Sequence, residues 1–106
     1  MADYIFNHHQ NSLNCRFSGK LDTDLSMKVR EELAYEVDEK LQKDHANPLT
    51  VTFDFKEVDF VTSAFIRLCI LIAKKTGRAH FSITGTNPFI KKTFKIAGLE
   101  QELNIT

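Results

Sequence analysis

The segment from Val51 to Ala73 constrains the fold more than any other, because it joins two different periodicities. Its first part alternates apolar and polar residues and puts Val51, Phe53 and Phe55 on one face. A period of two in β-branched and aromatic residues is typical of a strand with one buried face. Residues 64–73 then form an apolar run with a single charge, which favours a buried helix. The sequence therefore predicts a strand, a short turn and a buried helix.

Two hydroxyl residues, Thr62 and Ser63, stand at the junction, directly after the apolar pair Phe60-Val61. Serine and threonine are favoured N-caps, because the side-chain oxygen accepts a hydrogen bond from an N–H of the first turn. The start of a helix is also the positive end of its dipole, where a negative charge is tolerated. This junction is the best candidate for a functional site, and plain helix capping is the alternative.

Composition limits the classes of function. The chain has 106 residues, enough for one domain over 1–106, and its 14 basic residues balance its 14 acidic ones. A net charge of zero gives no electrostatic reason to expect nucleic acid or an anionic membrane as partner. The apolar run 68–73 is too short to cross a bilayer, and the first residues do not resemble a signal peptide. We expect a cytoplasmic protein in which Cys15 and Cys69 are reduced and incidental.

The other periodicities predict further strands alternating with helices. The expected elements are a weak edge strand at 4–6, a strand at 13–17, a helix at 25–43, the central strand and helix, a strand at 79–84, a helix from Asn87 to Gly98, and a short strand or packed tail at 99–105. A turn over 44–48 ends the first helix, because the residue before Pro48 is disfavoured in a helix. This order predicts an α/β domain, with a mixed sheet of four to five strands and three to four helices.

The central segment resembles the STAS domain, the fold of bacterial anti-sigma factor antagonists. That family has a strand of the form apolar–Asp–apolar, followed by an apolar–Asp–Ser–Ser/Thr–Gly–Leu turn that opens a helix. The matching segments are Phe53-Asp54-Phe55 and residues 61–66, VTSAFI. Thr62 replaces the usual Asp, and Phe65 replaces the usual Gly. Two more segments are similar to the family, SGKLD at 18–22 and the last helix with its Gly-Leu end, so the resemblance covers nearly the whole chain.

The resemblance implies a set of site residues. The family's phosphoacceptor falls on Ser63, with Thr62 as the alternative, and its aspartate near the phosphorylated turn falls on Asp22. The other interpretation is that Asp22 or Asp24 caps the following helix. Ile66, Cys69, Ile70 and Ala73 match the family's inward positions on the central helix, which leaves Phe65, Leu68 and Ile72 facing outward. We therefore expect an exposed apolar patch that contacts a protein partner, unless a neighbouring helix covers it. The expected partner-binding residues are Asp22, Thr62, Ser63, Ala64, Phe65, Leu68 and Ile72.

The function implied by the resemblance is partner switching in bacterial transcription regulation, without catalysis or a cofactor. The unphosphorylated domain, a monomer or weak dimer, would bind an anti-sigma factor that is also a GHKL-type serine kinase. Phosphorylation would end the binding and a serine phosphatase would restore it. Two alternatives stay open. One is a STAS accessory subunit that docks on the ATPase of an ABC transporter for phospholipid trafficking. The other is a module that binds a small ligand or nucleotide at the helix N-terminus.

Other chemistries find little support. His8, His9, His45 and His80 lack the spacing of metal ligands, and the four glycines form no phosphate-binding loop. Asp54 follows an apolar strand as in a response-regulator receiver, but the acidic cluster that a receiver needs is missing. A serine hydrolase would need a histidine near the turn and a glycine pattern around the nucleophile, and the sequence argues for neither.

Overall fold

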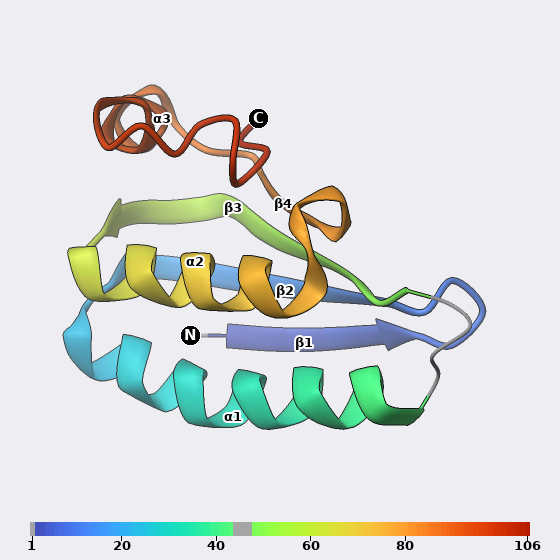
Figure 1. Ribbon diagram of the computed structural model, residues 1–106. Helices are drawn as coiled ribbons and strands as arrows, with labels where there is room; N and C mark the ends of the chain where they lie inside the picture. Colours follow the sequence, from blue (N-terminus) through green and yellow to red (C-terminus); the bar gives the residue numbers. More distant parts are fainter. Residues whose placement is uncertain (1, 44–47) are drawn as a thin grey trace.

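The computed structural model describes residues 2–43 and 48–106 and confirms the predicted α/β class (Figure 1). The elements are β1 (Ala2–Asn7), β2 (Ser12–Leu21), α1 (Thr23–Lys43), β3 (Thr50–Val61), α2 (Ser63–Thr76), a 3-10 turn (Arg78–His80), β4 (Phe81–Thr84) and α3 (Pro88–Ile96). The four strands form one mixed sheet in the order β1-β2-β3-β4, in which β1 runs antiparallel to β2 and the other pairs are parallel.

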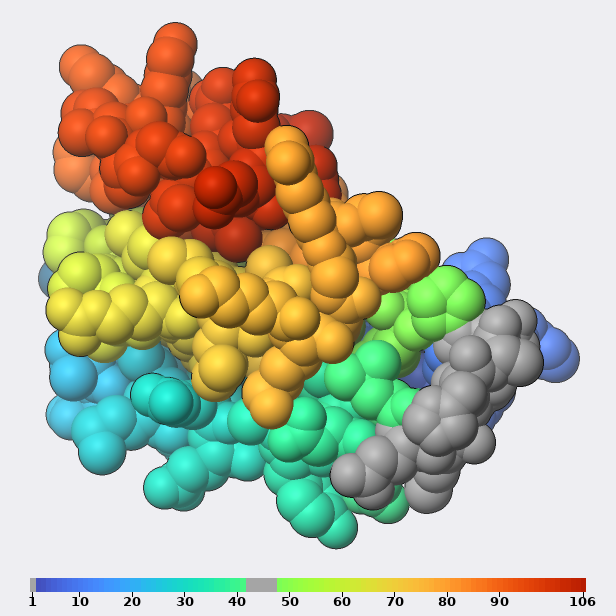
Figure 2. All heavy atoms as spheres, in the orientation of Figure 1, coloured from blue at the N-terminus to red at the C-terminus, as the bar shows by residue number. Residues whose placement is uncertain are grey.

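The helices cover one face of the sheet, so the domain has two layers. Alternate residues of the strands point into this layer, and they are buried: Leu13, Cys15, Phe17, Val51, Phe53, Phe55, Phe81 and Ile83. α1 lies beside α2, and an ion pair of 2.8 Å between Lys75 Nζ and Asp38 Oδ1 joins the two helices. Together they hide most of the sheet in Figure 2. The other face is polar, and Arg16 and Asp54 form an ion pair of 3.8 Å there.

Four phenylalanines hold α2 against the sheet. The ring of Phe65 in α2 lies 5.1 Å from that of Phe17 and 6.0 Å from that of Phe55, both edge to face. Phe53 completes the cluster, 5.0 Å from Phe17. Edge-to-face aromatic pairs add to the stabilisation that burial alone provides. The central strand and the central helix therefore share one core.

The expected exposed patch on α2 is not present, and this prediction was wrong. Phe65, Leu68 and Ile72 are only 0%, 3% and 0% exposed, whereas Ile66 and Ile70 are half-buried. The buried positions of α2 are 65, 68, 69, 72, 73 and 76, which is one stripe at helical spacing. Cys69 and Ala73 are buried as expected, but Phe65, Leu68 and Ile72 take the inward positions that the family resemblance gave to Ile66 and Ile70. These three side chains belong to the core.

Several element boundaries differ from the expectation. β3 is continuous through Phe60 and Val61, and β2 accommodates it by register shifts near Ser18 and Gly19. Ala79 lies in the 3-10 turn before β4 instead of in the strand. The end of the chain is a packed tail that makes one parallel bridge, from Ile105 to Ile83. Residues 44–47, which include His45 and most of the predicted turn over 44–48, lie outside the described residues.

Candidate functional site

The predicted site lies at the end of the sheet that holds the carboxyl ends of the parallel strands β2 and β3. Leu21 of β2 pairs with Val61 of β3, so the next residues, Asp22 and Thr62, leave the sheet side by side. α1 and α2 begin directly after them, both at this end of the sheet (Figure 1). The structure therefore brings together the three polar residues, Asp22, Thr62 and Ser63, that sequence reasoning selected from two distant segments.

Thr62 is the N-cap residue of α2 by its extended backbone, with φ −94° and ψ 164°, but its side chain does not cap the helix. The Thr62 hydroxyl donates a hydrogen bond of 2.8 Å to the carbonyl oxygen of Leu21. The Thr62 N–H donates to the same oxygen at 3.1 Å. The half-buried Thr62 therefore ties the end of β2 to the start of α2. Side-chain capping of α2, the alternative role that the sequence offered for Thr62, does not occur in the structure.

Ser63 is the first residue of α2, and its side chain is exposed. Among the described residues no hydrogen bond engages its hydroxyl, which lies at the end where the first N–H groups of a helix lack partners. Arg67 is exposed one turn later, at the i+4 position that neighbours Ser63 on the helix surface. Sequence reasoning overlooked Arg67, although it is the single charge between Ser63 and Ala73. Ala64, also expected to contact a partner, is half-buried.

Asp22 caps α1, as the second interpretation of this residue predicted. Its Oδ1 accepts a hydrogen bond of 2.9 Å from the N–H of Leu25. Its carbonyl accepts from both the N–H and the hydroxyl of Ser26, at 2.9 and 2.7 Å. Asp24 lies inside the helix as its second residue and is not the cap. The Asp22 side chain is nevertheless exposed beside the turn, so capping does not remove it from the surface.

Replacing Asp22 by alanine should lower the free energy of unfolding by about 1 kcal/mol, because α1 loses its side-chain cap. Asp22→Asn keeps an acceptor oxygen at this position and should retain most of the stability. Asp24→Ala removes an exposed acid from the same turn without removing a cap. Urea unfolding of the three variants tests this, and equal losses for Asp22→Ala and Asp24→Ala would contradict the capping role.

The exposed apolar residue nearest the turn in the chain is Phe60. It is 43% exposed and pairs across the strands with Lys20, which is also exposed. Its outward direction was visible in the sequence, since the strand alternation that buries Val61 turns Phe60 the other way. We name as the turn surface the solvent-exposed and half-buried residues at this end of the sheet: Lys20, Asp22, Phe60, Thr62, Ser63 and Arg67.

The other polar candidates do not form a site. Asp54 lies in the middle of β3, where it pairs with Arg16 and accepts a hydrogen bond from the N–H of Lys56. Burial raises the pKa of the Cys15 thiol to about 12 and also raises the pKa of the Cys69 thiol, so neither is a ready nucleophile. Within residues 2–43 and 48–106, no three histidines, cysteines or carboxylates gather to hold a metal ion. No helix there is both long and apolar enough to cross a membrane.

Comparisons with known proteins agree on the fold. No protein-family model and no curated protein sequence matches the chain. Among solved structures, the anti-sigma factor antagonist from Mycobacterium paratuberculosis is 15% identical, with a TM-score of 0.75 over 99% of this chain and 85% of its own. The phosphorylated form of the Bacillus cell fate determinant SpoIIAA is 15% identical, with a TM-score of 0.70 over 100% and 91%. A STAS domain protein from Planctomyces limnophilus is 20% identical, with a TM-score of 0.69 over 100% and 90%. The chain therefore has the SpoIIAA-like STAS fold that its sequence resembles.

Proposed function

We propose that this protein is a partner-switching regulator of the anti-sigma factor antagonist type, which acts by binding and not by catalysis. Its turn surface would bind an anti-sigma factor that is also a serine kinase, in the bacterial cytoplasm. Phosphorylation of Ser63 would release the partner, and a serine phosphatase would reverse the change. The proposal is supported by the fold, which the chain shares with solved antagonists, and by the position of Ser63 as the exposed first residue of α2.

The observation that carries the proposal is the difference between the two hydroxyls of the turn. The Thr62 hydroxyl is half-buried and donates to Leu21, so its modification would break a contact within the fold. The Ser63 hydroxyl is exposed and has no such contact in the described residues. A kinase can therefore modify Ser63 without opening the structure. This favours Ser63 over Thr62 as the phosphoacceptor.

A phosphate on Ser63 would be tolerated by the domain itself. It adds about −1.5 to −2 charges at pH 7 and three acceptor oxygens. These oxygens would lie at the positive end of α2, and Arg67 follows one turn along the same helix surface. A partner that covers the turn would meet a charge that it must desolvate, so the complex would weaken while the fold stays intact. That is the behaviour of a binding switch.

The experiment has two parts. Phosphosite mapping by mass spectrometry on protein from its own cells, in growth and under stress, should find phosphate on Ser63 that changes with condition. Binding to the purified anti-sigma factor kinase of the same cells should be tenfold or more weaker for Ser63→Glu, about 1.4 kcal/mol, and unchanged for Ser63→Ala. Gln101→Glu, at an exposed residue of the tail, is the control for added charge alone.

Two outcomes would contradict the proposal. If Ser63 carries no phosphate in any condition, the domain is a fixed adaptor, and docking on a membrane ATPase becomes the better interpretation. If Gln101→Glu weakens the complex as much as Ser63→Glu, the effect is one of net charge and not of the turn. A shift of the melting temperature by nucleotides would instead support the alternative of a ligand-binding module.

A further inference from the structure

β1 forms one edge of the sheet, and within the described residues no strand pairs with its outer side. The opposite edge is partly covered, because Ile105 bridges to Ile83 of β4. Exposed edge strands in natural proteins are usually protected by lysine, proline or a bulge. β1 has no lysine, proline or bulge; Asp3 is its one charged residue, and Ile5 on it is 56% exposed. The edge is therefore open to a further strand.

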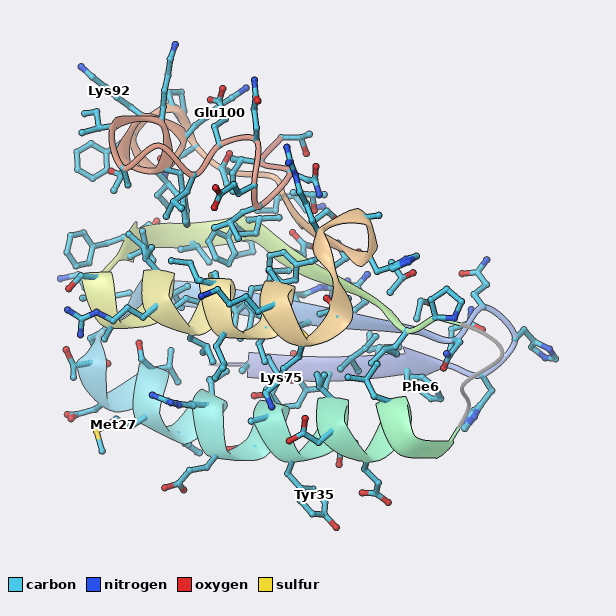
Figure 3. The ribbon with its side chains drawn as sticks, in the orientation of Figure 1. Phe6, Met27, Tyr35, Lys75, Lys92 and Glu100 are labelled. Carbon is cyan, nitrogen blue, oxygen red and sulfur yellow. The ribbon has the colours of Figure 1, made fainter. Side chains whose placement is uncertain are left out.

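A cleft of about 590 Å³ lies beside this edge, between β1 and the middle of α1. Among its lining residues are Tyr4, Phe6, Tyr35, Glu31, Glu32 and Glu36. In Figure 3, Phe6 lies between the end of β1 and α1, while Tyr35 extends from α1 into solvent. The cleft thus combines three aromatic rings with three carboxylates.

The charges of the cleft are not balanced internally. Lys40 is the one cation among the described residues that line it, and this ammonium is already held by Glu36 at 3.2 Å and by the ring of Phe6 at 4.3 Å from the ring centre. Glu31 and Glu32 are exposed and have no ion-pair partner within the described residues. A cation on the ring of Phe6 also indicates the kind of group that this aromatic surface accommodates. The unfilled part of the cleft favours a basic ligand.

The hydroxyl of Tyr4 gives a second indication of a ligand. This oxygen is buried and lies near the Glu32 carboxylate, but it makes no hydrogen bond of full geometry within the described residues. Burial, and then the neighbouring Glu32 carboxylate, raise the pKa of Tyr4, so the hydroxyl keeps its proton. A buried polar group without a partner is destabilising, so a backbone carbonyl of a bound segment that accepts this proton would remove that cost.

We propose that β1 and this cleft bind an extended segment of a partner protein that carries basic side chains at alternate positions. Its backbone would pair with the open edge of β1 as a fifth strand. Because side chains alternate along a strand, every second one would point over α1, toward Glu31 and Glu32. A second copy of this chain fits less well, since two acidic α1 faces would then meet. The proposal does not depend on Ser63, which lies at the start of α2 and not on the edge strand β1.

The test uses a fluorescein-labelled peptide of alternating lysine and valine and a matched peptide with glutamate in place of lysine. The lysine peptide should bind and shift the amide NMR signals of Ala2 to Asn7, whereas the glutamate peptide should not bind. The double variant Glu31→Gln/Glu32→Gln should weaken binding about tenfold or more. Glu57→Gln/Asp59→Asn, a similar charge change at exposed residues of β3, should alter it less than about twofold.

Tyr4→Phe separates a binding role of the hydroxyl from a structural one. It removes a buried group without a partner, so the unbound protein should be as stable as before or more stable, while the peptide binds more weakly. The proposal is overturned if neither peptide binds, or if both double variants lose affinity equally. It is also overturned if spermidine displaces the peptide while the β1 amides stay unshifted, or if the edge self-associates and Ile5→Lys prevents it.

Discussion

Phe65→Ala should be among the most damaging single substitutions in this protein and should lower the free energy of unfolding by about 3–5 kcal/mol. Phe65 is fully buried, and its ring contacts those of Phe17, Phe53 and Phe55. Alanine would lose the burial of the ring and leave a cavity at the centre of the sheet–helix interface, which the strands cannot collapse to fill. A loss of this size is a large part of the stability of an average domain.

Phe89→Ala is the matched control, because it removes the same ring from an exposed position. Phe89 in α3 is 64% exposed, so its replacement should change the free energy of unfolding by less than about 0.5 kcal/mol. Urea unfolding followed by circular dichroism measures both variants. If Phe65→Ala instead keeps the stability and loses only partner binding, Phe65 is a surface contact and the packing described above is wrong.

The unexpected burial of Phe65 shows which part of the fold could be predicted from the sequence and which could not. Strands such as Val51 to Phe55 alternate between two faces, and the polar residues mark which face is outside. The helix after them is apolar almost all round, so its own periodicity cannot select the inner face. That choice is made by contact with the sheet. The family resemblance placed Cys69 and Ala73 inward correctly, but it also placed Ile66 and Ile70 inward where the structure has Phe65, Leu68 and Ile72.

The candidate site, too, could be predicted from the sequence only in part. The junction of Thr62 and Ser63 could be found because both residues lie at one boundary between a strand and a helix. The resemblance ranked Ser63 above Thr62, but the physical difference between the two hydroxyls could not be predicted, since it depends on the carbonyl of Leu21, which is 41 residues away in the chain. The cleft beside β1 could not be seen at all, because it exists only after β1 and α1 pack together. Local patterns predict elements, whereas sites between elements need their arrangement.

The largest expected effect of a backbone change is at Gly85, where Gly85→Ala should lower the free energy of unfolding by about 3 kcal/mol. Gly85 follows β4 with φ +73°, in the left-handed region that costs an alanine about 1–2 kcal/mol. A Cβ atom here would also lie 3.0 Å from the backbone nitrogen of Lys56 in β3 and 3.1 Å from its Cα. These are backbone atoms of β3, which cannot move aside as the end of a flexible side chain does, so overpacking adds about 1–3 kcal/mol.

Gly98→Ala provides the comparison that isolates the contact with β3. Gly98 has nearly the same φ, +75°, but a Cβ there would meet nothing within 4 Å. Its replacement should therefore cost only the conformational part, about 1–2 kcal/mol. The difference between the two variants in urea unfolding measures how closely the turn after β4 must approach β3. Equal losses would mean that the backbone around Lys56 can move away from the added Cβ atom at no cost, and that Gly85 is needed for its backbone angle alone.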